Sequence, residues 1–147
     1  MGEAIHTGPA PDGFRTERSW TISRVEDLGR LRRGLHRALA GCCTSESIDH
    51  LVLVANELAT NALRHGSTPA IVRLMSNENE YLLEVIDRAV DAHPVVAGPR
   101  PAGQGGFGLL LARRLAEDVG FYTTPFAKHV WARFPVTSAA RSVAAAG

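Results

Sequence analysis

Residues 45–66 carry the pattern that most constrains the fold, because they predict one long helix with two different faces. An α-helix turns about 100° per residue, so apolar residues spaced three and four apart gather on one side. Seven residues share a broad arc that must pack against a core: Ile48, Leu51, Val52, Ala55, Leu58, Ala59 and Ala62. Ser45 or Ser47 can cap the helix start, and Gly66 suits the left-handed position that follows a helix end.

The opposite side of this helix carries a polar stripe. Glu57 and Asn61 are one turn apart in it, so their Cβ atoms lie about 5–6 Å apart and both side chains can act on one metal ion or phosphate. The stripe also contains His50 and Arg64, and the apolar residues Leu53 and Val54 flank it. This pattern is typical of a cleft wall, although an ordinary exposed helix face also contains Glu and Asn.

A second feature is the acid that ends the predicted strand 81–87. Alternate residues of a strand share a face, so Asp87 extends the apolar row of Tyr81, Leu83 and Val85. A carboxylate on that face needs hydrogen-bond donors. The exocyclic amino group of a purine is such a donor, and an aspartate that merely opens a turn is the alternative interpretation.

A third feature is a glycine-rich segment that leads directly into an apolar helix. Gly103, Gly105, Gly106 and Gly108 precede or begin the run that starts at Leu109. Glycines let a backbone approach a ligand closely, and the unpaired amides at a helix N-terminus can hold phosphate oxygens. The segment is not a P-loop, because no Gly-Lys-Ser/Thr follows it, and it does not follow a strand at Rossmann spacing.

Taken in order, these motifs resemble those of the GHKL ATPase and kinase family, which has the Bergerat nucleotide-binding fold. The N-box of that family is similar to ELATNALRHG at 57–66, its first glycine box to IDRA at 86–89, and its second to GGFGL at 105–109. The branch of small stand-alone anti-sigma-factor serine kinases has a final strand similar to KHVWARFPV at 128–136. The resemblance covers roughly residues 20–136.

The resemblance implies a role for each matching residue. Asn61 would bind Mg²⁺ together with the ATP phosphates, Glu57 would be the general base, and Asp87 would accept a hydrogen bond from the adenine amino group. The further nucleotide contacts implied are Ala89 beside the base, Gly105, Gly106, Phe107, Gly108 and Leu109 at the lid and helix start, and His129 on the last strand. Arg64 and His65 either approach the phosphates or simply favour the C-terminus of their helix as cations.

Several residues depart from the family pattern. Ala89 replaces a usual glycine, Gln104 and Gly105 stand where some relatives have an arginine and a serine, and His129 stands where a threonine is frequent. Binding tolerates such changes better than catalysis does, because catalysis requires interactions that strengthen only in the transition state. The resemblance therefore implies nucleotide binding more directly than phosphoryl transfer.

The function implied is that of an ATP- and Mg²⁺-dependent serine/threonine protein kinase of the anti-sigma-factor type. Such a protein would hold a sigma factor and phosphorylate a serine on an anti-anti-sigma protein, which regulates transcription by partner switching. The alternatives are a catalytically weak module whose nucleotide state controls partner binding, the ATP-binding domain of a histidine kinase, and a structural domain without a ligand.

Composition and length limit the other classes. At 147 residues we expect a disordered segment at 1–13, a single ATP-binding domain at 14–136 and a flexible tail at 137–147. A net charge of +1 argues against direct nucleic-acid binding, and the lack of a long apolar run argues against a membrane span. Residues 1–13 have no apolar core of signal-peptide type, so we expect a cytoplasmic protein. The adjacent Cys42 and Cys43 suit small buried residues better than a disulfide framework or a zinc site.

The remaining pattern predicts an α+β two-layer sandwich with helices on one face of a mostly antiparallel sheet. We expect strands at 14–22, 69–75 and 81–87, a hairpin at 121–124 and 129–135, and a first helix at 25–40. Leu28, Leu31 and Leu35 of that helix either face the core or contribute to a homodimer contact, as this region does in similar proteins. The loop at 88–105 is long enough to be a lid.

Overall fold

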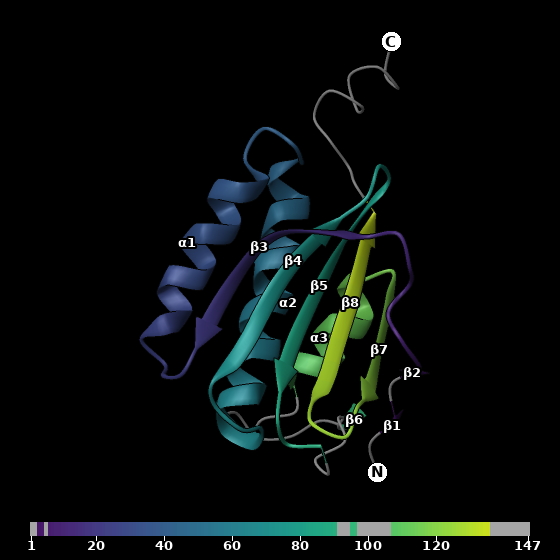
Figure 1. Ribbon diagram of the computed structural model, residues 1–147. Coiled ribbons are helices and arrows are strands. Elements are labelled where there is room, and N and C mark those ends of the chain that lie inside the picture. The colour runs from purple at the N-terminus through teal and green to yellow at the C-terminus, as the bar shows by residue number, and fades with distance from the viewer. Residues whose placement is uncertain (1–2, 5, 91–94, 97–106, 136–147) are drawn as a thin grey trace.

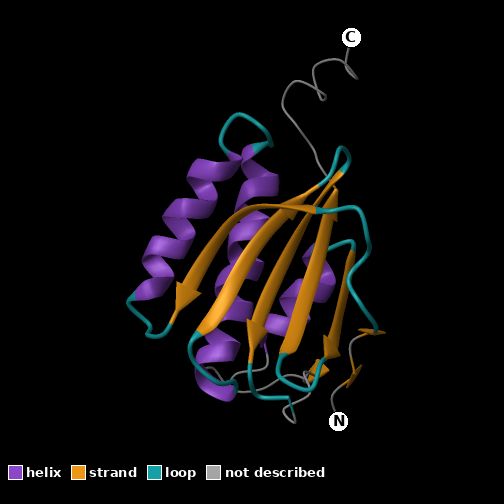
Figure 2. Cartoon of the chain, viewed as in Figure 1, coloured by secondary structure: helices purple, strands orange, loops and turns teal. Residues whose placement is uncertain are grey.

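The computed structural model describes residues 3–4, 6–90, 95–96 and 107–135, and these form two layers. Three helices, α1 (Asp27–Leu39), α2 (Ser45–His65) and α3 (Phe107–Leu115), lie on one face of a sheet. Figure 1 and Figure 2 show all three behind the strands, whose other face is turned toward the viewer. This arrangement confirms the predicted α+β sandwich.

The main sheet has six strands in the order β2-β7-β8-β5-β4-β3. Their bounds are β2 (His6–Thr7), β7 (Asp118–Thr123), β8 (Lys128–Pro135), β5 (Glu80–Asp87), β4 (Ala70–Ser76) and β3 (Arg15–Ile22). Every neighbouring pair is antiparallel except β2 and β7, which are parallel. A separate antiparallel pair joins β1 (Glu3–Ala4) to β6 (Val95–Val96).

The hydrophobic core lies between the helices and the sheet. Leu83 and Val85 of β5 belong to it, as the alternation of strand residues predicts. Leu28, Leu31 and Leu35 of α1 are also buried there, so this leucine row is core. Val54 of α2 is fully buried as well, which corrects the expectation that it flanks the polar stripe; Leu53 does, at 41% exposure.

The ends of α2 differ in detail from those predicted. Its N-cap is Thr44, whose Oγ1 accepts a hydrogen bond from the backbone N–H of Ser47 at 3.3 Å, so neither Ser45 nor Ser47 is the cap. Gly66 follows the helix with φ −96° and ψ −157°, which is extended backbone and not the predicted left-handed conformation. The reason for a glycine at this position is instead its close contact with the side chain of Asp87.

The N-terminal residues add to the far edge of the sheet. The sequence predicted no element within 1–13, whereas residues 3–4 and 6–7 are short strands, and β2 extends the sheet beside β7. Trp131 Nε1 donates a hydrogen bond to the carbonyl of Gly8 at 3.0 Å, which ties this segment to β8. None of the helices within the described ranges combines the length and apolarity that a membrane span requires.

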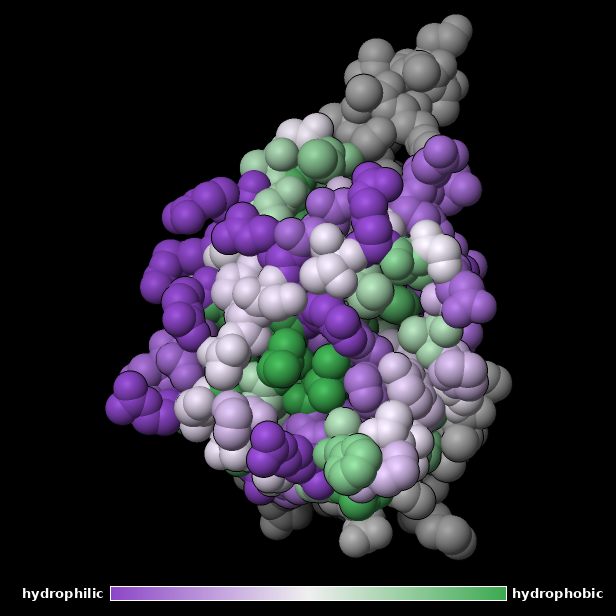
Figure 3. All heavy atoms as spheres, in the orientation of Figure 1, coloured by the Kyte–Doolittle hydropathy of each residue, from purple (hydrophilic) through white to green (hydrophobic). Residues whose placement is uncertain are grey.

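The open face of the sheet is mainly polar with an apolar centre (Figure 3). Ile71 on β4 is 41% exposed and pairs across the strands with Ile86 of β5. Beside them Glu84 is buried to 2% exposure, because the side chains around it cover its carboxylate. This face therefore contains its own buried acid, independent of the core.

Candidate functional site

Four element ends that carry the predicted motifs meet at one end of the molecule. The C-terminal end of α2, the N-terminal end of α3, the end of β5 and the start of β8 lie together at the lower end of Figure 1. The contacts of α2 with α3 and with β5, and the pairing of β5 with β8, hold these ends in place. The fold thus brings together the end of α2 at His65 and the start of β8 at Lys128, which are 63 residues apart in the sequence.

Asp87 is the buried acid of this end, with 3% exposure. Its Oδ1 accepts a hydrogen bond from the backbone N–H of Ala89 at 2.7 Å, and its Oδ2 lies 3.4 Å from the Nζ of Lys128. Asp87 and Lys128 are direct partners in the pairing of β5 with β8, so the sheet register fixes their proximity. Lys128 is itself buried to 6% exposure.

Gly66 allows the Asp87 carboxylate to pack against the end of α2. A Cβ atom at position 66 would lie 2.6 Å from Oδ2 of Asp87 and 2.7 Å from the carbonyl oxygen of Ala62. Both distances are too short for a carbon atom, so the close approach of the acid requires a glycine here. A glycine is therefore required at position 66, the last residue of the 57–66 motif, by its contact with Asp87 of the 86–89 motif.

Glu57 and Asn61 lie one turn apart on α2, and both are half-buried. Their spacing gives the predicted carboxylate and carboxamide pair on one helix face. Arg64 and His65 follow in the last turn and are exposed, in the position where cations favour the negative end of the helix dipole.

The glycine-rich segment is described only from residue 107 onward. The predicted helix starts at Phe107, which places Gly108 and Leu109 in the first turn of α3, where backbone amides have no partner within the helix. Gln104, Gly105, Gly106 and the remainder of the expected lid up to residue 106 lie outside the described residues, apart from 88–90 and 95–96.

His129 lies on the opposite face of the sheet from Asp87, which corrects its predicted place beside the nucleotide. Its ring stacks on Tyr122 with centroids 4.3 Å apart, and its Nδ1 lies 3.2 Å from Glu84 Oε2. Side chains alternate along a strand, so the residue of β8 that shares the face of Asp87 is Lys128. The sequence analysis names His129 and not its neighbour Lys128. Adjacent residues of a strand point to opposite faces of the sheet, so an error of one residue places the side chain on the wrong face.

Glu84 has several fixed partners on that open face. Arg73 Nη2 lies 2.6 Å from its Oε1, and Tyr122 Oη donates a hydrogen bond to Oε2 at 3.3 Å. Burial alone would raise the pKa of Glu84, but its interactions with His129 and Arg73 outweigh this and hold the pKa below its ordinary value. Burial, and then the Glu84 charge, raises the pKa of Tyr122.

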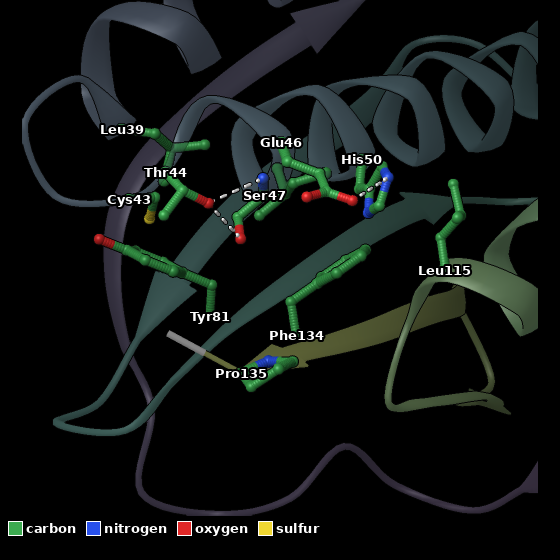
Figure 4. Close-up of a pocket in the computed structure, with 11 residues that line it drawn as sticks. Leu39, Cys43, Thr44, Glu46, Ser47, His50, Tyr81, Leu115, Phe134 and Pro135 are labelled. Carbon is green, nitrogen blue, oxygen red and sulfur yellow. Dashed lines mark hydrogen bonds and ion pairs between the residues drawn. The ribbon is translucent and has the colours of Figure 1, made fainter. Parts of the chain in front are cut away.

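A cavity of about 400 Å³ lies at the other end of α2 (Figure 4). Its walls combine apolar residues such as Leu39, Leu115 and Phe134 with Glu46 and His50, whose Oε1 and Nε2 atoms are 3.9 Å apart. Tyr81 and Cys43 also line the cavity. Burial raises the pKa of the Tyr81 hydroxyl and of the Cys43 thiol. Among the residues that the structure describes, none of those predicted to bind the nucleotide lines this cavity. Cys43 is buried as predicted, whereas Cys42 is exposed.

The donors on α2 suit a magnesium ion held mainly by phosphates. No cluster of three or more His, Cys, Asp or Glu side chains that could hold a metal occurs within the described ranges. Mg²⁺ in nucleotide sites keeps several waters and takes one or two protein oxygens in addition to phosphate oxygens. The carboxamide oxygen of Asn61 fits that requirement.

Comparisons with known proteins identify the family and the fold of this chain. The family model described as the histidine kinase-like ATPase domain matches residues 22–134. The structure of the RsbU and RsbW domains of Rv1364c from Mycobacterium tuberculosis matches with a TM-score of 0.59 and 18% sequence identity, over 82% of this chain and 33% of that one. At this identity the likeness shows a shared fold, and this chain corresponds to about a third of that protein. No curated protein sequence matches.

Proposed function

Because the chain belongs to the histidine kinase-like ATPase domain family, we propose that it is an ATP-dependent protein serine/threonine kinase of the anti-sigma-factor type. The observation that carries the proposal is the meeting of three motifs at one end of the fold. Asp87 ends β5 beside Gly66, the pair of Glu57 and Asn61 lies on the neighbouring helix, and the first turn of α3 begins at that same end. Residues 14–136 would form the ATP-binding domain.

Each group has a chemical task in this proposal. The oxygen of Asn61 would hold Mg²⁺, which neutralises phosphate charge when bound, and the backbone amides of the first turn of α3 would hold phosphate oxygens. Glu57 would accept the proton of the attacking serine hydroxyl. Phosphoryl transfer requires mainly positioning and charge stabilisation, so these few groups are sufficient. Asp87 would accept a hydrogen bond from the base.

The partners proposed are a sigma factor and an anti-anti-sigma protein that carries the phosphorylated serine. Support comes from the fold shared with a structure that contains an RsbW domain. It also comes from the surface of α1, where Arg33 and Arg37 are exposed and Arg30 and Arg32 reach toward β3 and α2. Such a cationic surface complements an acidic partner.

A binding module without phosphoryl transfer is the second candidate. The observation that favours it is the ion pair of Asp87 with Lys128, because the lysine already occupies one oxygen of the acid that would bind the base. In that case the nucleotide would only set the shape of a partner-binding surface.

Two substitutions on α2 separate the candidates. The protein is incubated with MgATP and candidate antagonist proteins, and phosphoserine is measured. For a kinase, Glu57→Ala abolishes transfer but leaves MgATP binding within about threefold, whereas Asn61→Ala weakens both. For a binding module, Glu57→Ala leaves partner release by MgATP unchanged and Asn61→Ala abolishes it. A wild-type protein that transfers no phosphate to any antagonist contradicts the kinase proposal.

A further inference from the structure

A strand from outside the matched family region reaches the end of the molecule that carries the proposed site. The family model begins at residue 22, and both β1 and β2 precede it. β1 pairs with β6, and the pairing sets Glu3 opposite Val96 and Ala4 opposite Val95. Figure 1 shows this pair at the lower end of the molecule, where the element ends that carry the motifs meet.

The N-terminal segment is anchored to the edge of the main sheet next to β1. β2 pairs in parallel with β7. The backbone N–H of Gly8 donates a hydrogen bond to the carbonyl of Phe121 at 2.9 Å, and Trp131 Nε1 donates one to the carbonyl of Gly8 at 3.0 Å. Trp131 is 1% exposed, so the packing of the sheet fixes this donor. A single residue separates β1 from β2 in the sequence, so β1 stays within about 7 Å of the anchored strand.

β6 belongs to the segment that joins two parts of the proposed site. This segment, residues 88–106, begins after Asp87, which would bind the base, and ends at α3, whose first turn would bind phosphates. β6 itself contacts α3. Long connections at functional sites commonly move during ligand exchange, and such movement often limits the rate of release. The pairing with β1 ties this connection to the sheet edge, so β6 can leave that edge only after the pairing breaks.

We propose that β1 is a positioning element of the nucleotide site, which slows the release of a bound adenine nucleotide by holding β6 beside α3. The inference rests on the proposed nucleotide site and deepens it by giving residues 3–4 a role there. β1 acts through β6 and needs no contact with the nucleotide. A net backbone hydrogen bond contributes modestly, so a pairing of two residues changes the release rate by a moderate factor.

The release of a fluorescent nucleotide measures this effect. The full chain is loaded with the magnesium complex of N-methylanthraniloyl-ATP, and an excess of MgATP is then added. A variant without residues 1–5 keeps β2 and Gly8 but loses β1. It should release the fluorescent nucleotide about five to ten times faster than wild type, as the loss of roughly one net hydrogen bond predicts.

A disulfide between paired positions should produce the opposite change. Ala4→Cys and Val95→Cys are combined with Cys42→Ser, which removes the exposed native thiol. Direct partners in an antiparallel pair have Cα atoms about 4.5–5.5 Å apart, a separation that a disulfide spans. After treatment with oxidised glutathione, this variant should release the nucleotide at least about ten times more slowly than its own reduced form. The matched controls are the two single-cysteine variants, which should release it within about twofold of wild type in either redox state.

The outcomes separate the inference from the function on which it rests. A wild type that binds the nucleotide, with equal release rates in the truncated and the cross-linked variants, overturns the inference and leaves the proposed function intact. Failure of the double-cysteine variant to form its disulfide also overturns the inference, because the two strands are then not paired in solution. If the truncated variant does not fold, the oxidised and reduced double-cysteine forms decide the question. A wild type that binds no nucleotide overturns the proposed function, and the inference with it.

Discussion

Two buried acids on the same strand, Glu84 and Asp87, have opposite kinds of surroundings. Glu84, on the open face, is enclosed by three side chains from three other strands, Arg73, Tyr122 and His129. Asp87, on the helix face, has one backbone amide, a lysine at 3.4 Å and a glycine that leaves room against it. Burial of an acid therefore does not by itself mark a binding site, because Glu84 is held by fixed partners and serves the fold.

The largest expected effect is the loss of free energy of unfolding when Glu84 is replaced. Glu84→Ala leaves Arg73 without its anion, and removal of one partner of a buried pair costs about 3–5 kcal/mol. Arg73 is 33% exposed and can regain water, so we expect the lower end, about 3 kcal/mol. Urea denaturation at pH 7 measures the change. Glu46→Ala, at an ion pair whose acid is 83% exposed, is the control and should cost less than about 1 kcal/mol. An equal cost for the two variants would contradict the role given to Glu84.

The contact between Gly66 and Asp87 gives the next effect. In Gly66→Ala the new Cβ would lie 2.6 Å from Asp87 Oδ2 and 2.7 Å from the Ala62 carbonyl, so the acid or the helix end must move. Overpacking of this kind costs about 1–3 kcal/mol. Unlike Glu84→Ala, this variant should also weaken MgATP binding, because it displaces the Asp87 carboxylate that we propose binds the base. Calorimetry on the folded variant measures this, and unchanged affinity would separate Gly66 from the site.

The smallest effect is the dependence of stability on pH. The pKa of Glu84 in the folded protein is lower than its ordinary 4.5, so the unfolded chain takes up a proton first as the pH falls. The stabilisation from Glu84 is therefore full above about 4.5 and is lost as the pH falls through the lower folded-state pKa. Urea unfolding at pH 7 and below pH 4 should show the gap between wild type and Glu84→Gln narrowing at the lower pH. A stability difference that widens at the lower pH would contradict the lowered pKa of Glu84.

The helices and strands that carry the three motifs could be predicted because each motif is local. The helical spacing of Glu57 and Asn61, the strand-end position of Asp87 and the helix start after the glycines each depend on a few neighbouring residues. The fold class followed from the same periodicities. These predictions required no knowledge of which strands pair.

The errors concern contacts that only the tertiary structure sets. The register of β5 with β8 decides that Lys128 and not His129 shares the face of Asp87, and a single residue reverses that choice. Gly66 was assigned a left-handed conformation because helices often end that way, whereas its contact with a residue 21 positions later is the reason for a glycine. The partners of Glu84 come from three strands, so no local pattern could indicate them.

Calorimetric titration of MgATP into wild type, Asp87→Asn and Glu84→Gln tests the central claim most directly. We expect wild type and Glu84→Gln to bind MgATP with dissociation constants within about threefold of each other, because Glu84 only supports the fold. Asp87→Asn should bind on the order of 10 to 100 times more weakly, since an acceptor with a full charge is lost at the base. A folded wild type that does not bind MgATP, or an Asp87→Asn variant that binds as tightly as wild type, would contradict the account.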